Sequence, residues 1–558
     1  MVVATVCQLR NSFLRYQFYL RRFLATIHCD MSYEDAIKSL NSLQSNAAVI
    51  EKIRNEQGRF QQNSLPEMLA FLHRINVKVS DLDSLNIIHI SGTKGKGSVS
   101  AFCESILRHS GLKTGLYTSP HLVEVRERIQ INGKPLDKTM FATYFFKCYE
   151  MLQKSCVHQE DKLPGYFRFL TLMAFKVFLS EKVDVVILEV GIGGAYDCTN
   201  VIQNPVVCGI SKLDLDHTAV LGRTISKIAW HKSGIMKSGR PTLTIQQVED
   251  AKIMLFNRAA ELKVPLFLVP PLDRFSNSIP NLGLDGEHQK ENASLAVQLC
   301  RIWFQQKHSF LNKSCLLPEE KTALMPNVSV DNEGLMTPFT LPDLFIQGLV
   351  KARWPGRCQI IKRDQISFFI DGAHTLESMK ASVKWFKSKQ ESSISRNEIF
   401  RILLFNVTSD RDPTPLLLTL FELDFDYAIF CPNILTPHVD MKSSDTANFN
   451  VSPNNLLINC DRIREAWLSV ITQMMPHFNN TSIQPDDYSF IFPQIDTAVR
   501  WLSNNKDRDI LKPELGGPTI PKKMAECQYT QVLVTGSLHL VGGLLKYLGP
   551  KFYNLFSE

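Results

Sequence analysis

The 558-residue sequence contains no C-x-x-C pair, although it has 13 cysteines, and these are scattered along the chain. Neither a zinc ribbon nor a dithiol redox site is therefore indicated, and reduced thiols in an intracellular compartment are the simplest interpretation. No stretch offers the ~20 uncharged apolar residues of a membrane span, so we expect no integral membrane segment. No long basic run and no internal repeat occur, and we expect no nucleic-acid partner.

The composition is that of a folded protein, with 44% hydrophobic and 21% charged residues. The chain is long enough for two or more domains, each with its own core. The formal net charge is +7 and the pI is about 8.6. Because the basic residues are spread along the chain, this charge suits small anionic substrates as readily as larger partners.

The N-terminal segment differs from the rest of the chain. Its first 29 residues contain no Asp or Glu, and arginines are interleaved with Phe, Leu and Tyr. This pattern is typical of a mitochondrial presequence, because a secretory signal would need an uninterrupted apolar core. We therefore expect residues 1–30 to be a presequence, with Met1 starting a mitochondrial form and Met31 a cytosolic one. A disordered basic arm is the alternative.

Short β-rich runs alternate with helical patterns along most of the chain, which predicts an α/β fold with mainly parallel sheets. We expect a large N-terminal domain at 31–335, a linker at 336–352 and a smaller α/β domain at 353–558. The expected strands are Asn86–Ile90, Gly115–Thr118, Val183–Val190, Val206–Ser211, Pro241–Ile245, Gln359–Ile361, Ile366–Ile370, Ile402–Val407, Tyr427–Cys431 and Val532–Thr535.

Three stretches lack clear periodicity. The pattern fades between Ile302 and about Leu349, which suggests a linker. The segments Thr436 to Ser452 and Asn479 to Tyr529 are expected to be surface loops.

The segment His89 to Ala101 reads H-I-S-G-T-K-G-K-G-S-V-S-A and joins an expected strand to a helix predicted from Ser98 to His109. Glycines at such a turn let backbone N–H groups face one anion, and Lys96 would supply charge to a bound phosphate. The usual phosphate loop, however, has Ser or Thr directly after the lysine, where this chain has Gly97. A tight turn with solvated lysines is the alternative.

A second candidate lies in V-V-I-L-E-V-G-I-G-G, where an apolar strand ends in Glu189. A buried acid is costly unless it is paired or bound to a cation, and a strand-end carboxylate beside a phosphate loop can hold magnesium. A helix-capping role is the alternative. The third candidate is L-D-L-D-H-T, where the preference of magnesium for oxygen donors favours Asp214 or Asp216 over His217.

Several other polar clusters begin or end regular elements, and each alone could equally be a cap or a turn. They are T-S-P-H at 118–121, W-H-K-S-G at 230–234, E-H-Q-K-E-N at 287–292, R-W-P-G-R at 353–357 and I-D-G-A-H at 370–374.

Taken together and in this order, these segments resemble the folylpolyglutamate synthases of the Mur ligase superfamily. The resemblance covers nearly the whole chain from about Met31. It includes S-G-T-K-G-K-G-S, Y-T-S-P-H-L-V-E-V-R-E-R-I-Q-I-N-G, Y-F-R-F-L-T-L-M-A-F, L-E-V-G-I-G-G-A-Y-D-C-T-N, L-D-H-T-A-V-L-G, W-P-G-R, F-I-D-G-A-H-T and T-S-D-R-D-P. It implies a P-loop-type ATP-binding domain followed by a Rossmann-like C-terminal domain.

The resemblance also implies roles for individual residues, and it replaces the two aspartates by His217 as the magnesium ligand. Lys232 matches a lysine that is carbamylated in some relatives. The implied roles are ATP binding by Gly95, Lys96, Gly97, Ser98, Asn292, Arg357 and Asp371; metal binding by Ser119, Glu189 and His217; folate binding by Ser119, Pro120 and His121; and catalysis by Lys96, Lys232 and His374.

The implied activity is ATP-dependent addition of L-glutamate to reduced folates through γ-linked amide bonds, by way of an acyl phosphate. It would retain folates in cells and support one-carbon metabolism. The implied cofactors are ATP, Mg²⁺ and a monovalent cation, K⁺, and we expect a monomer in the mitochondrion and the cytoplasm. A dihydrofolate synthase is the nearest alternative, and a nucleotide-binding regulator without ligase activity is the alternative of another class.

Overall fold

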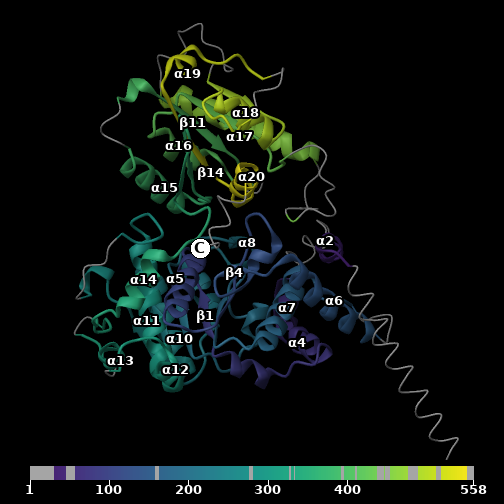
Figure 1. Ribbon diagram of the computed structural model, residues 1–558, viewed down its shortest axis with the longest axis vertical. Helices are drawn as coiled ribbons and strands as arrows, with labels where there is room; N and C mark the ends of the chain where they lie inside the picture. Colours follow the sequence, from purple (N-terminus) through teal and green to yellow (C-terminus); the bar gives the residue numbers. More distant parts are fainter. Residues whose placement is uncertain are drawn as a thin grey trace, which may run out of the picture.

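The structure is a computed structural model that describes residues 31–44, 57–156, 162–275, 281–325, 328–331, 334–390, 395–408, 411–435, 445, 453–474, 488–510 and 517–549. The presequence predicted at 1–30 lies outside these residues, as does most of the segment Thr436 to Ser452. Within the described residues the chain forms two sheets, each covered by helices on both faces (Figure 1).

The first sheet has eight strands in the order β4-β3-β2-β5-β1-β6-β7-β8 in the part of the chain that the structure describes. Strands β2, β5, β1, β6, β7 and β8 are parallel, and β3 and β4 extend the β2 edge in antiparallel fashion. Their bounds are β1 Ile88–Ser91, β2 Thr114–Tyr117, β3 Ile129–Ile131, β4 Lys134–Pro135, β5 Val185–Glu189, β6 Val207–Ile210, β7 Thr242–Thr244 and β8 Leu266–Leu268.

Helices bury both faces of this sheet. One core joins α5, α11 and α14 to the sheet, and another joins α2, α4, α6 and α7 to its other face. The helices are α2 Tyr33–Asn41, α4 Gln57–Arg74, α5 Lys96–His109, α6 Lys138–Lys154, α7 Tyr166–Glu181, α8 Thr218–Leu221, α9 Ile225–Ser233, α10 Glu249–Leu262, α11 Gln289–Gln306, α12 His308–Lys313, α13 Pro318–Leu324 and α14 Asp343–Lys351. We call this sheet with its helices the first unit.

The second sheet has the strand order β13-β12-β11-β14-β10-β9, and all its pairs are parallel except that of β9 with β10. The strands are β9 Gln359–Lys362, β10 Ile366–Ile370, β11 Ile399–Phe405, β12 Tyr427–Phe430, β13 Ser489–Ile491 and β14 Tyr529–Thr535. The helices are α15 Leu376–Ser388, α16 Thr414–Phe421, α17 Pro453–Met474, α18 Ile495–Ser503, α19 Lys522–Glu526 and α20 Leu538–Leu548. This sheet with its helices is the second unit.

Local sequence explains where several of these elements begin. Ser32 accepts a hydrogen bond from the Asp35 N–H while the Asp35 carboxylate binds the Ser32 N–H, which forms a capping box at the start of α2. Asp137 caps α6 in a similar way through the Met140 N–H. The apolar run of β5 is fully buried because helices cover both faces of the parallel sheet.

Every predicted strand is present, but two predictions of irregular structure are wrong. The stretch expected to be a linker contains α14, whose Phe345 and Leu349 are buried in the core against α5. Its Gly348 touches the backbone of Ile106. The stretch Asn479 to Tyr529 contains β13, α18 and α19. These elements are short, and short helices are stabilised mainly by tertiary packing.

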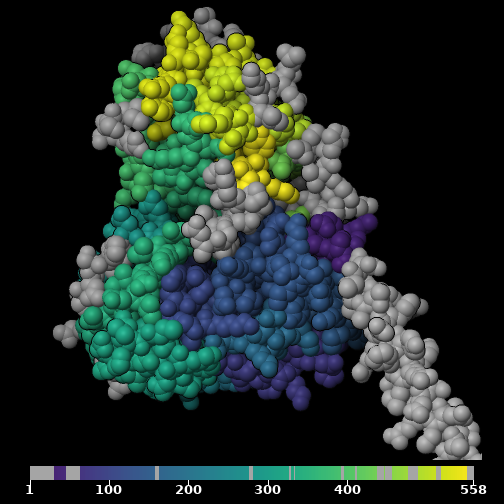
Figure 2. Space-filling model, viewed as in Figure 1, coloured from purple at the N-terminus to yellow at the C-terminus, as the bar shows by residue number. Residues whose placement is uncertain are grey.

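The two units are stacked with the site between them. In Figures 1 and 2 the first unit, purple to teal, lies below the second, green to yellow. Leu122, from the loop after β2, contacts Gly356 and the backbone of α20 at Gly542, and Val123 joins the core of the second unit. Among the described residues, none of the helices combines the length and apolar character needed to span a bilayer.

Candidate active site

The register of the parallel strands gathers the predicted residues at one edge of the first sheet. Ile90 of β1 pairs with Glu189 of β5, and Ser91 pairs with Ile210 of β6. On the other side of β5, Tyr117 of β2 pairs with Leu188. The loops that leave β1, β2, β5 and β6 therefore emerge side by side, as expected for a ligand site at the carboxyl ends of parallel strands.

The loop after β1 has the geometry of an anion-binding turn. Helix α5 begins at Lys96, and Gly95 precedes it with a φ of +84°, a left-handed conformation that favours glycine. The N–H groups of the first turn and the helix dipole point toward the region where an anion would lie. Below the loop, the buried Lys232 donates a hydrogen bond of 2.7 Å from Nζ to the carbonyl of Gly92.

Gly97, the departure from the usual phosphate-loop pattern, lies against an indole ring. A Cβ atom at this position would come within 2.9 Å of Nε1 of Trp354, which lies between α14 and β9. A Ser or Thr directly after Lys96 would therefore collide with Trp354. Gly95 is restricted in a similar way by the Asn292 side chain of α11. The glycines thus let the segment that leads into the second unit lie directly on the loop.

Glu189 and Ser119 form the acidic part of the site. Glu189 is 4% exposed, and one of its carboxylate oxygens accepts a hydrogen bond of 3.0 Å from the Ser119 N–H. Burial raises the pKa of the Glu189 carboxyl, while Lys96, the Ser119 bond and Arg357 oppose this shift. The Glu189 carboxylate and the Ser119 hydroxyl are oxygen donors of the kind that Mg²⁺ prefers, so these two neighbouring residues fit a magnesium ion.

A cleft opens beside these residues. It unites six of the predicted site residues with apolar and polar side chains from both units. Its lining is Gly97, Thr118, Ser119, Pro120, His121, Leu122, Glu127, Gln130, Glu189, Trp354, Pro355, Arg357 and Leu538. His121 is buried in the cleft wall, where Arg128 donates a hydrogen bond of 2.9 Å to its Nδ1. A ligand in this cleft would contact both units.

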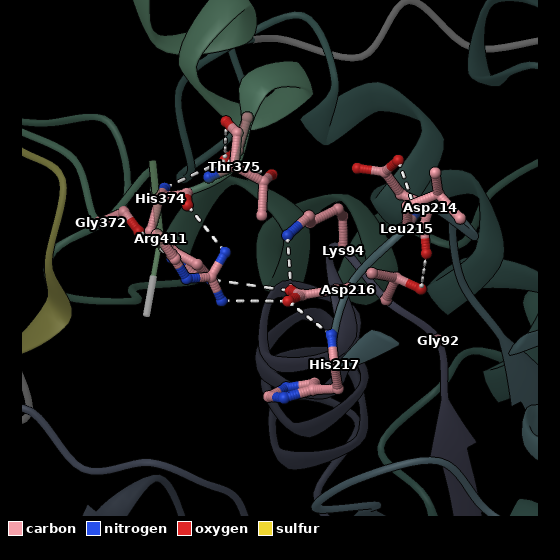
Figure 3. Close-up of polar contacts among 12 residues, drawn as sticks. Gly92, Lys94, Asp214, Leu215, Asp216, His217, Gly372, His374, Thr375 and Arg411 are labelled. Carbon is pink, nitrogen blue, oxygen red and sulfur yellow. Dashed lines mark hydrogen bonds and ion pairs between the residues drawn. The ribbon is translucent and has the colours of Figure 1, made fainter. Parts of the chain in front are cut away.

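A second cluster surrounds Asp216 at the same edge of the sheet (Figure 3). Its carboxylate binds Nζ of Lys94 at 3.0 Å and a guanidinium nitrogen of Arg411 at 3.0 Å. It also accepts a hydrogen bond from the backbone N–H of His217, whose φ is +49°. The oxygens of Asp216 are thus occupied by cations of the protein, which makes it a poor magnesium ligand. The strained backbone at His217 is typical of functional positions.

His374 reaches the Asp216 cluster from the second unit. Its Nδ1 lies 2.7 Å from the Gly372 carbonyl, which can only accept, so Nδ1 carries the proton and Nε2 the lone pair. Nε2 is 3.9 Å from Asp216. Burial, followed by the charge of Lys94, lowers the pKa of His374 to about 3, so the imidazole is neutral at physiological pH. His374 can therefore accept a hydrogen bond near the site.

The remaining predicted residues support the loops rather than line the cleft. Asp371 accepts hydrogen bonds from the N–H groups of Cys358 and Ala373, and so fixes the segments that carry Arg357 and His374. The Asn292 side chain lies against Gly95 of the phosphate loop. Burial, then Lys96, lowers the pKa of Lys232 well below its ordinary value. Its neutral amine is the form that can react with CO₂.

The structure adds two residues that had no individual role predicted from sequence. They are Trp354, in the W-P-G-R segment, and Arg411, in T-S-D-R-D-P. Their motifs marked them, but their partners come from distant parts of the chain, so sequence alone did not show what they contact. Ser409 and Asp410 of the second motif lie outside the described residues.

No protein-family model matches the chain, but several named proteins match nearly its whole length. The mitochondrial folylpolyglutamate synthase of Bos taurus is 43% identical over 564 residues, which cover 93% of each chain. The folylpolyglutamate synthase of Saccharomyces cerevisiae (strain YJM789) is 37% identical over 563 residues, 96% of this chain and 92% of the yeast protein. This chain belongs to the folylpolyglutamate synthase family.

Solved structures of this family share the fold. Mycobacterium tuberculosis folylpolyglutamate synthase complexed with ADP matches with a TM-score of 0.62 at 22% identity, over 90% of this chain and 98% of that chain. The apo form of the L. casei synthase gives a TM-score of 0.59 at 22% identity, over 93% and 100% of the two chains. The predicted α/β fold, with a larger N-terminal part and a smaller α/β C-terminal part, is confirmed.

The contact between Gly97 and Trp354 generates a prediction. We expect Gly97→Ser to lower the free energy of unfolding by about 1–3 kcal/mol, because the new side chain overpacks the indole. Denaturant unfolding measures this loss. When Gly97→Ser is made in a Trp354→Leu background, the loss should be less than half as large as in the wild-type background. Gly165→Ser is the matched control, since a Cβ there meets only the Leu43 carbonyl, at 3.9 Å. If Gly97→Ser lowered the free energy of unfolding equally with and without Trp354, the indole would not be the reason that position 97 requires glycine.

Proposed function

We propose that this protein is an ATP-dependent ligase that adds L-glutamate to reduced folates through γ-linked amide bonds. The observation that carries the proposal is the cleft where the phosphate loop, the Ser119–Glu189 pair and Arg357 of the second unit converge. Membership of the folylpolyglutamate synthase family supports the choice of substrates. A reaction that joins two carboxylate-bearing molecules through a phosphorylated intermediate needs such a mixture of cations and oxygen donors.

ATP would bind with its phosphates at the start of α5. The N–H groups of Gly95, Gly97 and Ser98 and the Lys96 ammonium supply donors for the β- and γ-phosphates. Arg357 would meet the nucleotide from the second unit, with Asp371 holding its segment in place. Asn292 would support the loop from α11. These positions account for the ATP-binding residues implied by the sequence.

Ser119, Glu189 and His217 are the proposed holders of Mg²⁺, and K⁺ is the proposed monovalent cation. Bound magnesium would offset the negative charge that develops on the phosphoryl oxygens. Lys232 would be carbamylated, since its lowered pKa favours the amine that accepts CO₂. Among the described residues, no group of three or more His, Cys, Asp and Glu side chains is placed to hold a metal ion by itself.

The proposed chemistry proceeds in two steps. The terminal γ-carboxylate of the folate attacks the γ-phosphorus of ATP, which releases ADP and gives an acyl phosphate. The amino group of glutamate then attacks the acyl carbon, phosphate leaves, and one proton is lost to form the amide. His374 would accept a hydrogen bond from this amine through Nε2 and so position it, because its pKa of about 3 makes it a weak base at neutral pH.

Closure of the second unit over the first would protect the acyl phosphate from water. Folate would enter the cleft beside Ser119, Pro120 and His121, where Trp354 and Leu538 offer apolar contacts and Gln130 a polar one. We propose a domain division near the end of α14, because this helix packs on α5 of the first unit. The protein would act as a monomer, since both faces of the cleft come from one chain.

We propose that residues 1–30 direct the chain to the mitochondrial matrix, with or without association with the inner membrane. Initiation at Met31 would give a cytoplasmic form. The mitochondrial name of the bovine relative supports this proposal. Residues 1–30 fused to a fluorescent reporter should accumulate in mitochondria, whereas a diffuse cytosolic signal would refute the presequence.

The ligase proposal predicts a defined reaction. Purified protein supplied with ATP, Mg²⁺ and radiolabelled glutamate should extend tetrahydrofolate, and removal of Mg²⁺ by a chelator should abolish the extension. Chromatography of the labelled products measures the chain length. Incorporation with dihydropteroate alone would identify a dihydrofolate synthase instead, and incorporation with neither substrate would favour a regulator without ligase activity.

Lys96→Ala tests the role of the phosphate loop in this assay, and Lys290→Ala is its matched control. The substitution removes the charge that faces the phosphates, and we expect kcat to fall by about 10²–10³-fold while the fold is retained. Lys290→Ala removes an exposed lysine that pairs with Glu287 on the surface, and it should leave turnover unchanged. Near-normal turnover of Lys96→Ala would show that the loop has been misinterpreted.

A further inference from the structure

Asp216 lies between the two units, and its two carboxylate oxygens face cations from different units. Lys94, from the loop after β1, binds Oδ2, and Arg411, which precedes α16, binds Oδ1, both at 3.0 Å. The residue is 9% exposed. Burial alone would raise the pKa of its carboxyl, but Lys94, His217 and Arg411 hold that pKa well below its ordinary value. Asp216 is therefore a charged bridge.

Arg411 extends this bridge into the second unit. Its other guanidinium nitrogen donates a hydrogen bond of 3.0 Å to the His374 carbonyl. Its own carbonyl accepts a hydrogen bond of 3.0 Å from Arg462 of α17. Figure 3 shows the resulting line of contacts from Lys94 through Asp216 and Arg411 to His374. The bridge thus connects the phosphate loop to the segment that carries a proposed functional histidine.

We propose that Asp216 is a positioning residue that holds the second unit against the phosphate loop and thereby sets the location of His374. The inference rests on the proposed ligase function for its kinetic readout. Without the carboxylate, Lys94 and Arg411 would face each other as uncompensated cations, with Lys232 also nearby. The second unit would then lie less closely on the first. Lys94 would remain free to meet a bound phosphate.

The test compares glutamate use with nucleotide binding. A residue with a merely structural role would affect both to the same extent. In Asp216→Asn, we expect kcat/KM for glutamate to fall at least tenfold, because His374 is no longer held. The Kd of a non-hydrolysable ATP analogue should rise by a smaller factor, because Lys96 and the N–H groups of the phosphate loop stay in place and only the contact of Arg357 with the nucleotide is weakened. Equal weakening of nucleotide binding and glutamate use, or no change in either, would overturn the proposal.

Asp214→Asn is the matched control. It removes the same charge from the same loop, but its carboxylate binds the Leu215 N–H and lies on the side of Lys94 away from Arg411 (Figure 3). We expect kcat/KM for glutamate to stay within threefold of wild type. A loss as large as that of Asp216→Asn would mean that net charge, not the bridge, matters, and would overturn the proposal.

A double variant tests whether Asp216 acts through Arg411. If the two share one contact, Asp216→Asn combined with Arg411→Gln should lose no more kcat/KM than the more damaged single variant. If the fold-losses in kcat/KM of the two single variants multiplied in the double variant, Asp216 and Arg411 would act independently and the proposal would be overturned. If the wild-type protein had no ligase activity, the proposed function would fail, and small-angle scattering would still test the bridge. Asp216→Asn should increase the radius of gyration, and an unchanged radius would overturn the proposal.

Discussion

The site depends on one constraint, which is the shared register of parallel strands on either side of β1. Because Ile90 pairs with Glu189 and Ser91 with Ile210, the loops after three neighbouring strands leave the sheet at one level. In the second sheet, Ile370 pairs with Val534 and Phe405 with Thr535, so its loops also leave from one edge. The two edges face each other, and nearly all the candidate chemistry lies within a few residues of a strand end.

Burial of charge decides how these residues can act. Glu189 and Lys232 are buried with shifted pKa values, and neither carries its charge as readily as in water. Asp216 remains ionised because it lies between Lys94 and Arg411. Trp354 meets the phosphate loop at Gly97, so the residue that departs from the usual pattern is also a contact with the segment leading to the second unit.

Much of the fold could be predicted because buried parallel strands are continuous apolar runs with glycines at their ends. All ten expected strands are present, whereas β3, β4, β8 and β13 were not predicted, since two to three residues give little periodic signal. Helix α14 was missed because it is a short helix within the stretch that was expected to be a linker. The loop around Lys96 could be located from its sequence. The ion pair between Asp216 and Arg411 could not be predicted, because the two residues are 195 positions apart in the chain.

We propose one site that spans the two units, with the phosphates of ATP at the start of α5. A crystal structure with a non-hydrolysable ATP analogue and Mg²⁺ tests it most directly. We expect the β- and γ-phosphates to lie within hydrogen-bond distance of Lys96 and the N–H groups of Gly95 to Ser98, with Arg357 contacting the same nucleotide. A nucleotide bound away from this loop, or contacted by the first unit alone, would contradict it.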